Sequence, residues 1–291
     1  MNLKMTLLLD IAVYIFMLTC WLTQQVTSLS VFYLDMAYNA FDDQYEGCIE
    51  AMEEKAPQLL KEELSMNKNF KKEWEKAKEK WKQIKYKINH SEKFSDFHGT
   101  AIVAYTGEIA IDFNRAVREF GLNPHNFQYK AFHYYLTRAL QLLRTYQCDY
   151  VFRGSHTKFY YNGTGSVRFG QFTSSSLYRK VAVSPTFISK GGTLFVIRTC
   201  VGVNIEEFSQ YPEEKEVLIP GYEVYKKVTV KQTHENYNEI SLESPQRQKS
   251  NFNCFYAHSR IHSKSDSNFN SSGMQKGLVF LLPLLPLLAE L

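Results

Sequence analysis

The chain has 291 residues, of which 44% are hydrophobic and 22% are charged, and its formal net charge is +4. This composition is that of a globular protein, and it excludes a low-complexity polymer and a multi-pass membrane protein. The small net charge, with acids interspersed among the lysines, does not indicate nucleic acid as a partner.

The N-terminal segment has the layout of a secretory signal. A lysine precedes an apolar run over residues 7–21, and small and polar residues follow. Val26 and Ser28 occupy the positions before a cleavage site, so we expect a signal peptide over residues 1–28. An N-terminal membrane anchor is the alternative, but the apolar run is shorter than the roughly 20 residues that span a bilayer.

The next part of the chain is predicted to be helical. Residues 51–88 are rich in Lys and Glu and contain no glycine. Apolar residues recur in steps of four and three, at Phe70, Trp74, Ala77, Trp81, Ile84 and Ile88. This spacing predicts an amphipathic helix with a solvated charged face, and a coiled-coil partner is the alternative. Two further helices are predicted over residues 109–120 and 131–145.

After Cys148 the pattern changes to short β-branched and aromatic runs separated by Gly, Ser, Asn and Pro. Strands are predicted over residues 150–154, 165–169, 193–198, 216–220 and 222–228. Helices followed by strands, without regular alternation, indicate an α+β fold rather than a doubly wound parallel sheet. We expect one domain over residues 29–272.

The C-terminus is an apolar tail of about fifteen residues that contains two prolines, which is short for a spanning helix. Small residues at 270–273 and a brief polar spacer precede it. This is the pattern of glycosylphosphatidylinositol (GPI) attachment, so we expect residues 273–291 to be removed. A tail-anchored protein is the alternative, and it conflicts with a secretory signal at the other end.

Cysteines and sequons agree with export. Four cysteines follow the predicted signal: Cys48, Cys148, Cys200 and Cys254. An even number in an exported chain predicts two disulfides, and the spacing leaves all three pairings open. No pair has CxxC spacing, so no metal site is expected. Glycosylation sequons begin at Asn89, Asn162 and Asn270.

Candidate chemistry lies near the ends of the predicted strands. Glu214 and Glu216 flank one residue at a loop-to-strand junction. In an extended chain their side chains point to the same face, about 6–7 Å apart at Cα. Two such carboxylates can divide catalytic work, although a bare ExE is also an ordinary acidic loop. Arg153 and the serine run at 174–176 are equally uninformative alone.

In chain order, however, these pieces resemble a known family. Arg153, the segment 169–176 (FGQFTSSS) and the segment 214–224 (EKEVLIPGYEV) resemble the arginine, serine, glutamate-x-glutamate signature of vertebrate mono-ADP-ribosyltransferases. Other family-like segments are residues 39–48, 96–101, 129–140 and 249–254. The resemblance covers about residues 32–260 and is strongest to the GPI-anchored T-cell ecto-enzyme branch.

The resemblance implies a single α+β domain, with N-terminal helices packed on a two-sheet mixed β core and an NAD cleft. It also implies disulfides between Cys48 and Cys254 and between Cys148 and Cys200. NAD is then a substrate, and no metal is needed. Four residues are expected to line the NAD pocket beside Arg153: Tyr105, Gly154, Gln171 and Phe187.

The resemblance also assigns catalytic roles. Glu216 would hydrogen-bond the ribose 2′-hydroxyl and stabilise an oxocarbenium-like transition state. Glu214 would orient or activate the incoming guanidinium, and Arg153 would hold the pyrophosphate. Ser174 would position Glu216. The alternatives for that last role are Ser175 and Ser176.

The expected function is transfer of ADP-ribose from NAD to arginine side chains of surface or secreted proteins, with release of nicotinamide and some NAD hydrolysis. We expect the enzyme at the outer leaflet of the plasma membrane, GPI-anchored or shed. The alternatives are an NAD glycohydrolase and a catalytically silent surface antigen. Lys215, between the two glutamates, is expected either to lower both carboxylate pKa values or to repel a guanidinium acceptor.

Overall fold

The computed structural model describes residues 31–145 and 147–257. The predicted signal peptide, the Asn270 sequon and the predicted removable tail lie outside these residues. The described residues from Tyr33 onward belong to one compact unit. No helix in these two stretches is long and apolar enough to cross a membrane.

The N-terminal half is helical, as predicted. Its helices are α2 (Ile49–Met66), α3 (Lys68–Ile84), α4 (Asp96–Tyr105), α5 (Ile109–Arg118) and α6 (Lys130–Leu143). Short 3₁₀ turns cover Lys85–Lys87, Phe120–Leu122 and Pro124–Asn126. The single helix expected over residues 51–88 is two helices. The chain becomes extended at Asn67, whose side chain accepts a hydrogen bond from the backbone N–H of Phe70 and so begins α3.

The predicted apolar stripe is confirmed on α3. Phe70, Trp74, Ala77 and Trp81 are buried, and the lysines between them are exposed. Trp81 also stacks on Phe208, with ring centroids 5.7 Å apart and planes 4° apart. The stripe therefore fixes α3 to the segment that precedes the two glutamates.

The C-terminal half forms strands. Its strands are β2 (Asp149–Ser155), β3 (Phe159–Tyr160), β4 (Thr173–Ser176), β5 (Thr193–Thr199), β6 (Val203–Asn204), β7 (Glu216–Ile219), β8 (Glu223–Gln232) and β9 (Asn238–Arg247). A two-residue strand, β1 (Phe32–Tyr33), precedes the helices. A short helix, α7 (Arg179–Ala182), follows β4. The strand predicted over residues 165–169 is wrong: that segment makes only an isolated bridge between Val167 and Tyr225.

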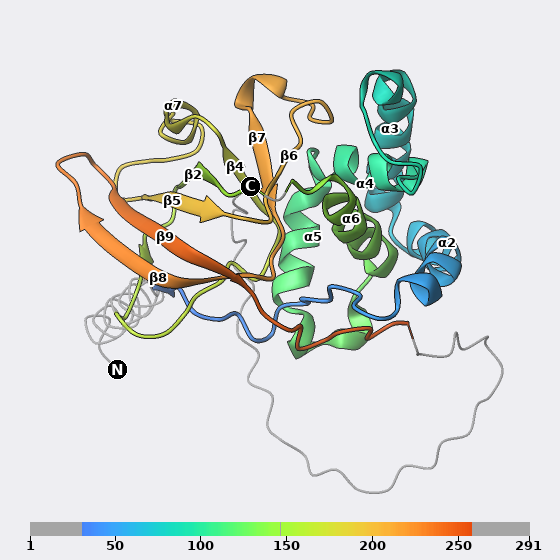
Figure 1. The fold of residues 1–291 in the computed structure, drawn as a ribbon, viewed down its shortest axis with the longest axis horizontal. Coiled ribbons are helices and arrows are strands. Elements are labelled where there is room, and N and C mark those ends of the chain that lie inside the picture. The colour runs from blue at the N-terminus through green and yellow to red at the C-terminus, as the bar shows by residue number, and fades with distance from the viewer. Residues whose placement is uncertain (1–30, 146, 258–291) are drawn as a thin grey trace, which may run out of the picture. The chain divides into compact units, whose positions relative to one another are not determined.

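Two sheets of very different size result. Seven strands form a mixed sheet in the order β6-β7-β4-β2-β5-β9-β8, and β1 pairs with β3. Only β5 and β9 are parallel neighbours, and the other pairs in the large sheet are antiparallel. Helices α2 to α6 lie toward the β6-β7 end of the sheet (Figure 1). The α+β prediction is confirmed.

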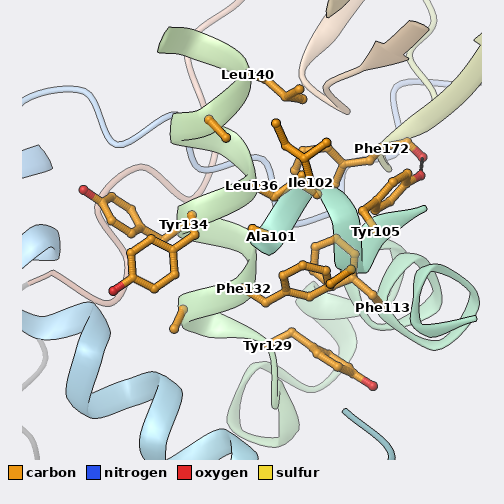
Figure 2. Close-up of a cluster of buried hydrophobic side chains, with 14 of the residues drawn as sticks. Ala101, Ile102, Tyr105, Phe113, Tyr129, Phe132, Tyr134, Leu136, Leu140 and Phe172 are labelled. Carbon is orange, nitrogen blue, oxygen red and sulfur yellow. Dashed lines mark hydrogen bonds between the residues drawn. The ribbon is translucent and has the colours of Figure 1, made fainter. Parts of the chain in front are cut away.

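Aromatic side chains join the helices to this end of the sheet. The largest buried cluster contains residues of α2 to α6 together with Phe172, Phe208 and Leu218 from the strand half. Figure 2 shows Phe172 beside Tyr105 of α4, whose hydroxyl donates to the Phe172 carbonyl at 2.9 Å. Phe113 stacks on Phe172 with ring centroids 5.5 Å apart. The C-terminal end of α4 is therefore held against the start of β4.

The first and last described segments lie side by side (Figure 1). Asp42 accepts hydrogen bonds from the backbone N–H groups of residues 251 and 252, and Asp43 accepts them from residues 254 and 255. The Cys48–Cys254 disulfide closes the same contact. The second disulfide joins Cys148 and Cys200. These are the two pairings that the resemblance implies.

Candidate active site

A pocket opens where the C-terminal end of α4 meets strands β2, β4 and β7 and the α7 segment. Seven predicted site residues line it: Tyr105, Arg153, Gly154, Ser174, Phe187, Glu214 and Glu216. The alternative serines also line it: Ser175 and Ser176. Gln171 is not among the lining residues, and its side-chain oxygen accepts a hydrogen bond from the Arg118 guanidinium.

The order of the strands brings the arginine, serine and glutamate together. β4 lies between β2 and β7, so that Ser176 faces Phe152 on one side and Glu216 on the other. The Nη1 atom of Arg153 donates to the backbone carbonyl of Ser174 at 2.8 Å. Arg153, Ser174 and Glu216 therefore lie on three adjacent strands although they are far apart in the sequence.

The Glu216 carboxylate is buried, with 6% of the residue exposed. Burial raises its pKa to about 7, and the negative charge of Glu214 contributes to the rise. Hydrogen bonds from Ser174 and Ser209 and the positive charge of Arg153 act in the opposite direction on this pKa. Glu216 is therefore poised to change charge near neutral pH.

Glu214 reaches the same pocket through a turn. It ends a 3₁₀ turn over Pro212–Glu214, and Lys215 follows in the left-handed conformation with φ of 50°. The expectation that Glu214 and Glu216 share an extended chain is wrong. The Oγ atom of Ser176 donates to the backbone carbonyl of Glu214 at 2.6 Å, and this contact fixes the turn against β4.

Lys215 does not lower the pKa values of its two neighbours. Its ammonium group forms an ion pair with Glu206, which raises the pKa of the lysine. The pKa of Glu214 is raised by burial and by the charge of Glu213, and that of Glu216 is raised mainly by burial. The expected lowering is therefore wrong, because burial dominates both carboxylates and Lys215 is engaged by Glu206.

Gly154 allows α7 and the following loop to approach β2. A Cβ atom on this residue would lie 2.1 Å from the backbone oxygen of Ala182 and 2.9 Å from that of Phe187. Both neighbours are backbone atoms, so rotation of a side chain cannot relieve the overlap. The glycine thus sets the position of the pocket wall that carries Phe187.

Tyr105 is a fixed, neutral hydrogen-bonding group in the pocket. Its hydroxyl donates to the Phe172 carbonyl and accepts a hydrogen bond from Asn114 Nδ2 at 2.9 Å. Burial raises the pKa of Tyr105 to about 12, so that the phenol stays protonated at neutral pH.

The chain is similar to known proteins over nearly its whole length. The family model for NAD:arginine ADP-ribosyltransferases matches residues 34–250. The chain belongs to this family. It is 60% identical to mouse T-cell ecto-ADP-ribosyltransferase 2 over 281 residues, which cover 96% of each chain. It is 58% identical to mouse T-cell ecto-ADP-ribosyltransferase 1 over 278 residues, 94% of this chain and 95% of the relative.

Solved ADP-ribosyltransferase structures agree with this assignment. A mutant of the eukaryotic mono-ADP-ribosyltransferase ART2.2 in complex with NADH matches with a TM-score of 0.74 and 61% identity, over 77% of this chain and 99% of that one. A second ART2.2 mutant, in complex with NAD, matches equally well. In the described part of this ADP-ribosyltransferase, no group of three or more His, Cys, Asp or Glu side chains is placed to hold a metal ion.

Five residues that line the pocket of this ADP-ribosyltransferase were not predicted from the sequence. The additional lining residues are Thr106, Phe152, Val181, Ala182 and Tyr211. Tyr211 stands three residues before Glu214, so the ExE pattern itself could have drawn attention to it. The apolar residues of β2 and α7 carry no comparable signal in the sequence, because their place in the pocket depends on the close approach at Gly154.

Proposed function

We propose that this ADP-ribosyltransferase cleaves NAD between nicotinamide and ribose in the pocket at Glu216 and transfers ADP-ribose to an arginine side chain of a protein. One observation carries the proposal: a buried carboxylate and a second, half-buried one, Glu214, face one pocket together with Arg153 and Ser174. Family membership supplies the reaction class, NAD:arginine ADP-ribosyl transfer.

In the proposed mechanism, Glu216 acts on the ribose. Cleavage of the glycosidic bond develops positive charge at the anomeric carbon while nicotinamide leaves with the bonding electron pair. An ionised carboxylate held close to this ribose stabilises the charge, and it does so more strongly in a buried site than in water. The pKa of about 7 means that a large fraction of Glu216 is ionised at physiological pH.

Glu214 is proposed to act on the acceptor. A guanidinium is a poor nucleophile because its very high pKa keeps it protonated. A carboxylate beside it can orient the group and accept the proton that is released when the guanidinium nitrogen bonds to the anomeric carbon. Glu214 suits this role because burial raises its pKa and makes it a better base.

Arg153 and the aromatic side chains of the pocket are proposed to hold the dinucleotide. A guanidinium binds phosphate oxygens through parallel N–H donors, which fits the pyrophosphate of NAD. Phe187 is proposed to stack on the nicotinamide ring. Ser174 is proposed to contact the nicotinamide ribose while it hydrogen-bonds Glu216. Since Gln171 is bonded to Arg118 outside the pocket lining, we assign it no direct contact with NAD.

The test is to follow NAD labelled in the adenosine moiety with purified protein and an arginine-rich acceptor. Transfer puts label on the acceptor, whereas hydrolysis releases free ADP-ribose. Glu214→Gln should suppress transfer more than hydrolysis, and Glu216→Gln should reduce both at least about a hundredfold. Equal loss of the two reactions in Glu214→Gln would contradict the role given to that residue. Free ADP-ribose alone from the wild type would favour an NAD glycohydrolase, and no turnover would favour a silent antigen.

We further propose that the enzyme works outside the cell, anchored through GPI and glycosylated. Both relatives described above carry the prefix ecto in their names, and two disulfides suit an oxidising compartment. Asn89 and Asn162 are exposed, as glycan attachment requires. Release from cells by a phosphatidylinositol-specific phospholipase tests the anchor, and retention on the membrane would count against it.

A further inference from the structure

Ser209 lies next to the buried carboxylate and has no part in the roles given so far. It is 6% exposed, and its Oγ lies 3.4 Å from Glu216 Oε2. The same Oγ accepts a hydrogen bond from the backbone N–H of Tyr211 at 3.0 Å. Because the hydroxyl oxygen is the acceptor in that contact, its proton is left to donate to Glu216.

Two contacts hold Ser209 in place. The preceding residue, Phe208, is buried and stacks on Trp81 of α3. The following residue, Gln210, donates its backbone N–H to Thr106 Oγ1 at 3.3 Å. The serine therefore sits at a point where the chain is attached to the helical half, one residue before the loop turns outward.

The residues after Ser209, from Tyr211 to Glu214, form a loop at the rim of the pocket, called the rim loop below. Tyr211 is 52% exposed and lines the pocket, and Glu214 lies three residues further on. The Ser209 hydroxyl thus touches the loop that carries Glu214 on one side and the Glu216 carboxylate on the other.

We infer that Ser209 is a positioning residue, which holds the Glu216 carboxylate in its working orientation and links it to the rim loop carrying Tyr211 and Glu214. This inference rests on the role proposed for Glu216. Ser209 complements Ser174, which approaches Glu216 from β4.

The hydrogen bond from Ser209 affects the charge of Glu216. The groups that act on it are Ser174 from β4, Arg153 from β2, Glu214 from the turn and Ser209. Tyr105 of α4 also faces it, as a neutral phenol. A hydrogen bond donated to a carboxylate favours the ionised form. Without the Ser209 hydroxyl, Glu216 would therefore hold its proton to higher pH.

The structure offers a matched control in Thr199. Its hydroxyl donates to a buried carboxylate, that of Glu223, and accepts the backbone N–H of Gly202 at 2.8 Å. This is the same arrangement as at Ser209, but Thr199 and Glu223 are not among the lining residues of the pocket. Thr199→Val therefore removes an equivalent hydroxyl without touching the site.

The experiment compares Ser209→Ala, Ser209→Thr and Thr199→Val in the full ectodomain. We expect Ser209→Ala to lower kcat about three- to tenfold at pH 7, to move the acid limb of the pH profile to higher pH, and to leave the KM for NAD unchanged. Ser209→Thr should restore the profile, and Thr199→Val should leave its shape unchanged.

A second readout is independent of turnover. Carbon NMR of the glutamate carboxyl groups, assigned with Glu216→Gln, follows the titration of Glu216 directly. A higher titration midpoint in Ser209→Ala but not in Thr199→Val supports the inference, and an unchanged midpoint overturns it. If Glu216→Gln turns over NAD as fast as the wild type, the proposed function fails, and this result is separate from the titration.

Discussion

Replacement of Gly154 by alanine tests how the pocket wall is positioned. The new Cβ would lie 2.1 Å from the backbone oxygen of Ala182, whereas ordinary van der Waals contact begins at 3.4 Å. One backbone must therefore move by about 1.3 Å. Gly154 is paired with Leu194 inside the large sheet, so the segment that yields is α7 with the loop carrying Phe187.

The expected cost falls on both activity and stability. A displacement of about 1 Å in a group that orients a substrate lowers the rate on the order of a hundredfold, so kcat/KM for NAD should fall to this extent in Gly154→Ala. Overpacking of this kind lowers the free energy of unfolding by about 1–3 kcal/mol. NAD turnover and urea unfolding measure the two effects separately.

Gly163→Ala is the control for this experiment. No atom lies within 4 Å of a Cβ at Gly163, although its φ of 85° also disfavours alanine. This variant should lose about 1 kcal/mol of stability and keep its kcat/KM. Equal kinetics in Gly154→Ala and Gly163→Ala would refute the argument that the contact between Gly154 and the α7 segment shapes the pocket.

Three further predictions concern charge and covalent links. Burial raises the pKa of Glu216 to about 7, and the proposed mechanism uses its ionised form, so kcat/KM should be lost as pH falls through 7 and be about tenfold lower at pH 6 than at pH 8. An acid limb of the pH profile near about pH 4.5 would contradict this prediction. Arg168→Met leaves Asp42 buried without its 2.7 Å ion pair and should cost about 3–5 kcal/mol in urea unfolding, whereas a loss below 1 kcal/mol would show that Asp42 is satisfied by backbone alone. Cys48 and Cys254 close a loop with a sequence separation of 206, so their double replacement by serine should cost about 5 kcal/mol on chain entropy, and an unchanged thermal midpoint would argue against that model.

Much of the fold follows from local patterns. The stripe from Phe70 to Trp81 is buried as its spacing predicts, and four of the five predicted strands are present. The break at Asn67 was not predicted, because no glycine or proline marks it in the sequence; it shows in the extended backbone of this residue and in its side-chain hydrogen bond to the Phe70 N–H. β9 was not predicted because apolar and polar residues alternate only weakly along it. Its position follows from backbone pairing with β5 on one side and β8 on the other.

Less of the site than of the fold could be predicted from the sequence, and the motif residues show why. Arg153, Ser174 and Glu216 attract attention only as a set, because their proximity depends on the order β2-β4-β7. Ser209 lies outside the motif and became visible through its distance to Glu216. Gln171 matched the family segment, yet its side chain bonds to Arg118 rather than lining the pocket.

Lys215 shows that a cation next to two carboxylates in the sequence need not lower their pKa values. A non-glycine residue with φ of 50° costs roughly 1–2 kcal/mol, and the surrounding contacts must impose this conformation. The left-handed turn sends the ammonium group to Glu206 while the flanking carboxylates face the pocket. The two glutamates therefore have raised pKa values despite the cation between them, because burial dominates both, with smaller contributions from the charge of Glu213 on Glu214 and of Glu214 on Glu216. A lysine at this position is thus compatible with a Glu216 carboxylate whose pKa lies near 7 and with a Glu214 carboxylate that is a stronger base than a free glutamate, as the role proposed for Glu214 on a guanidinium requires.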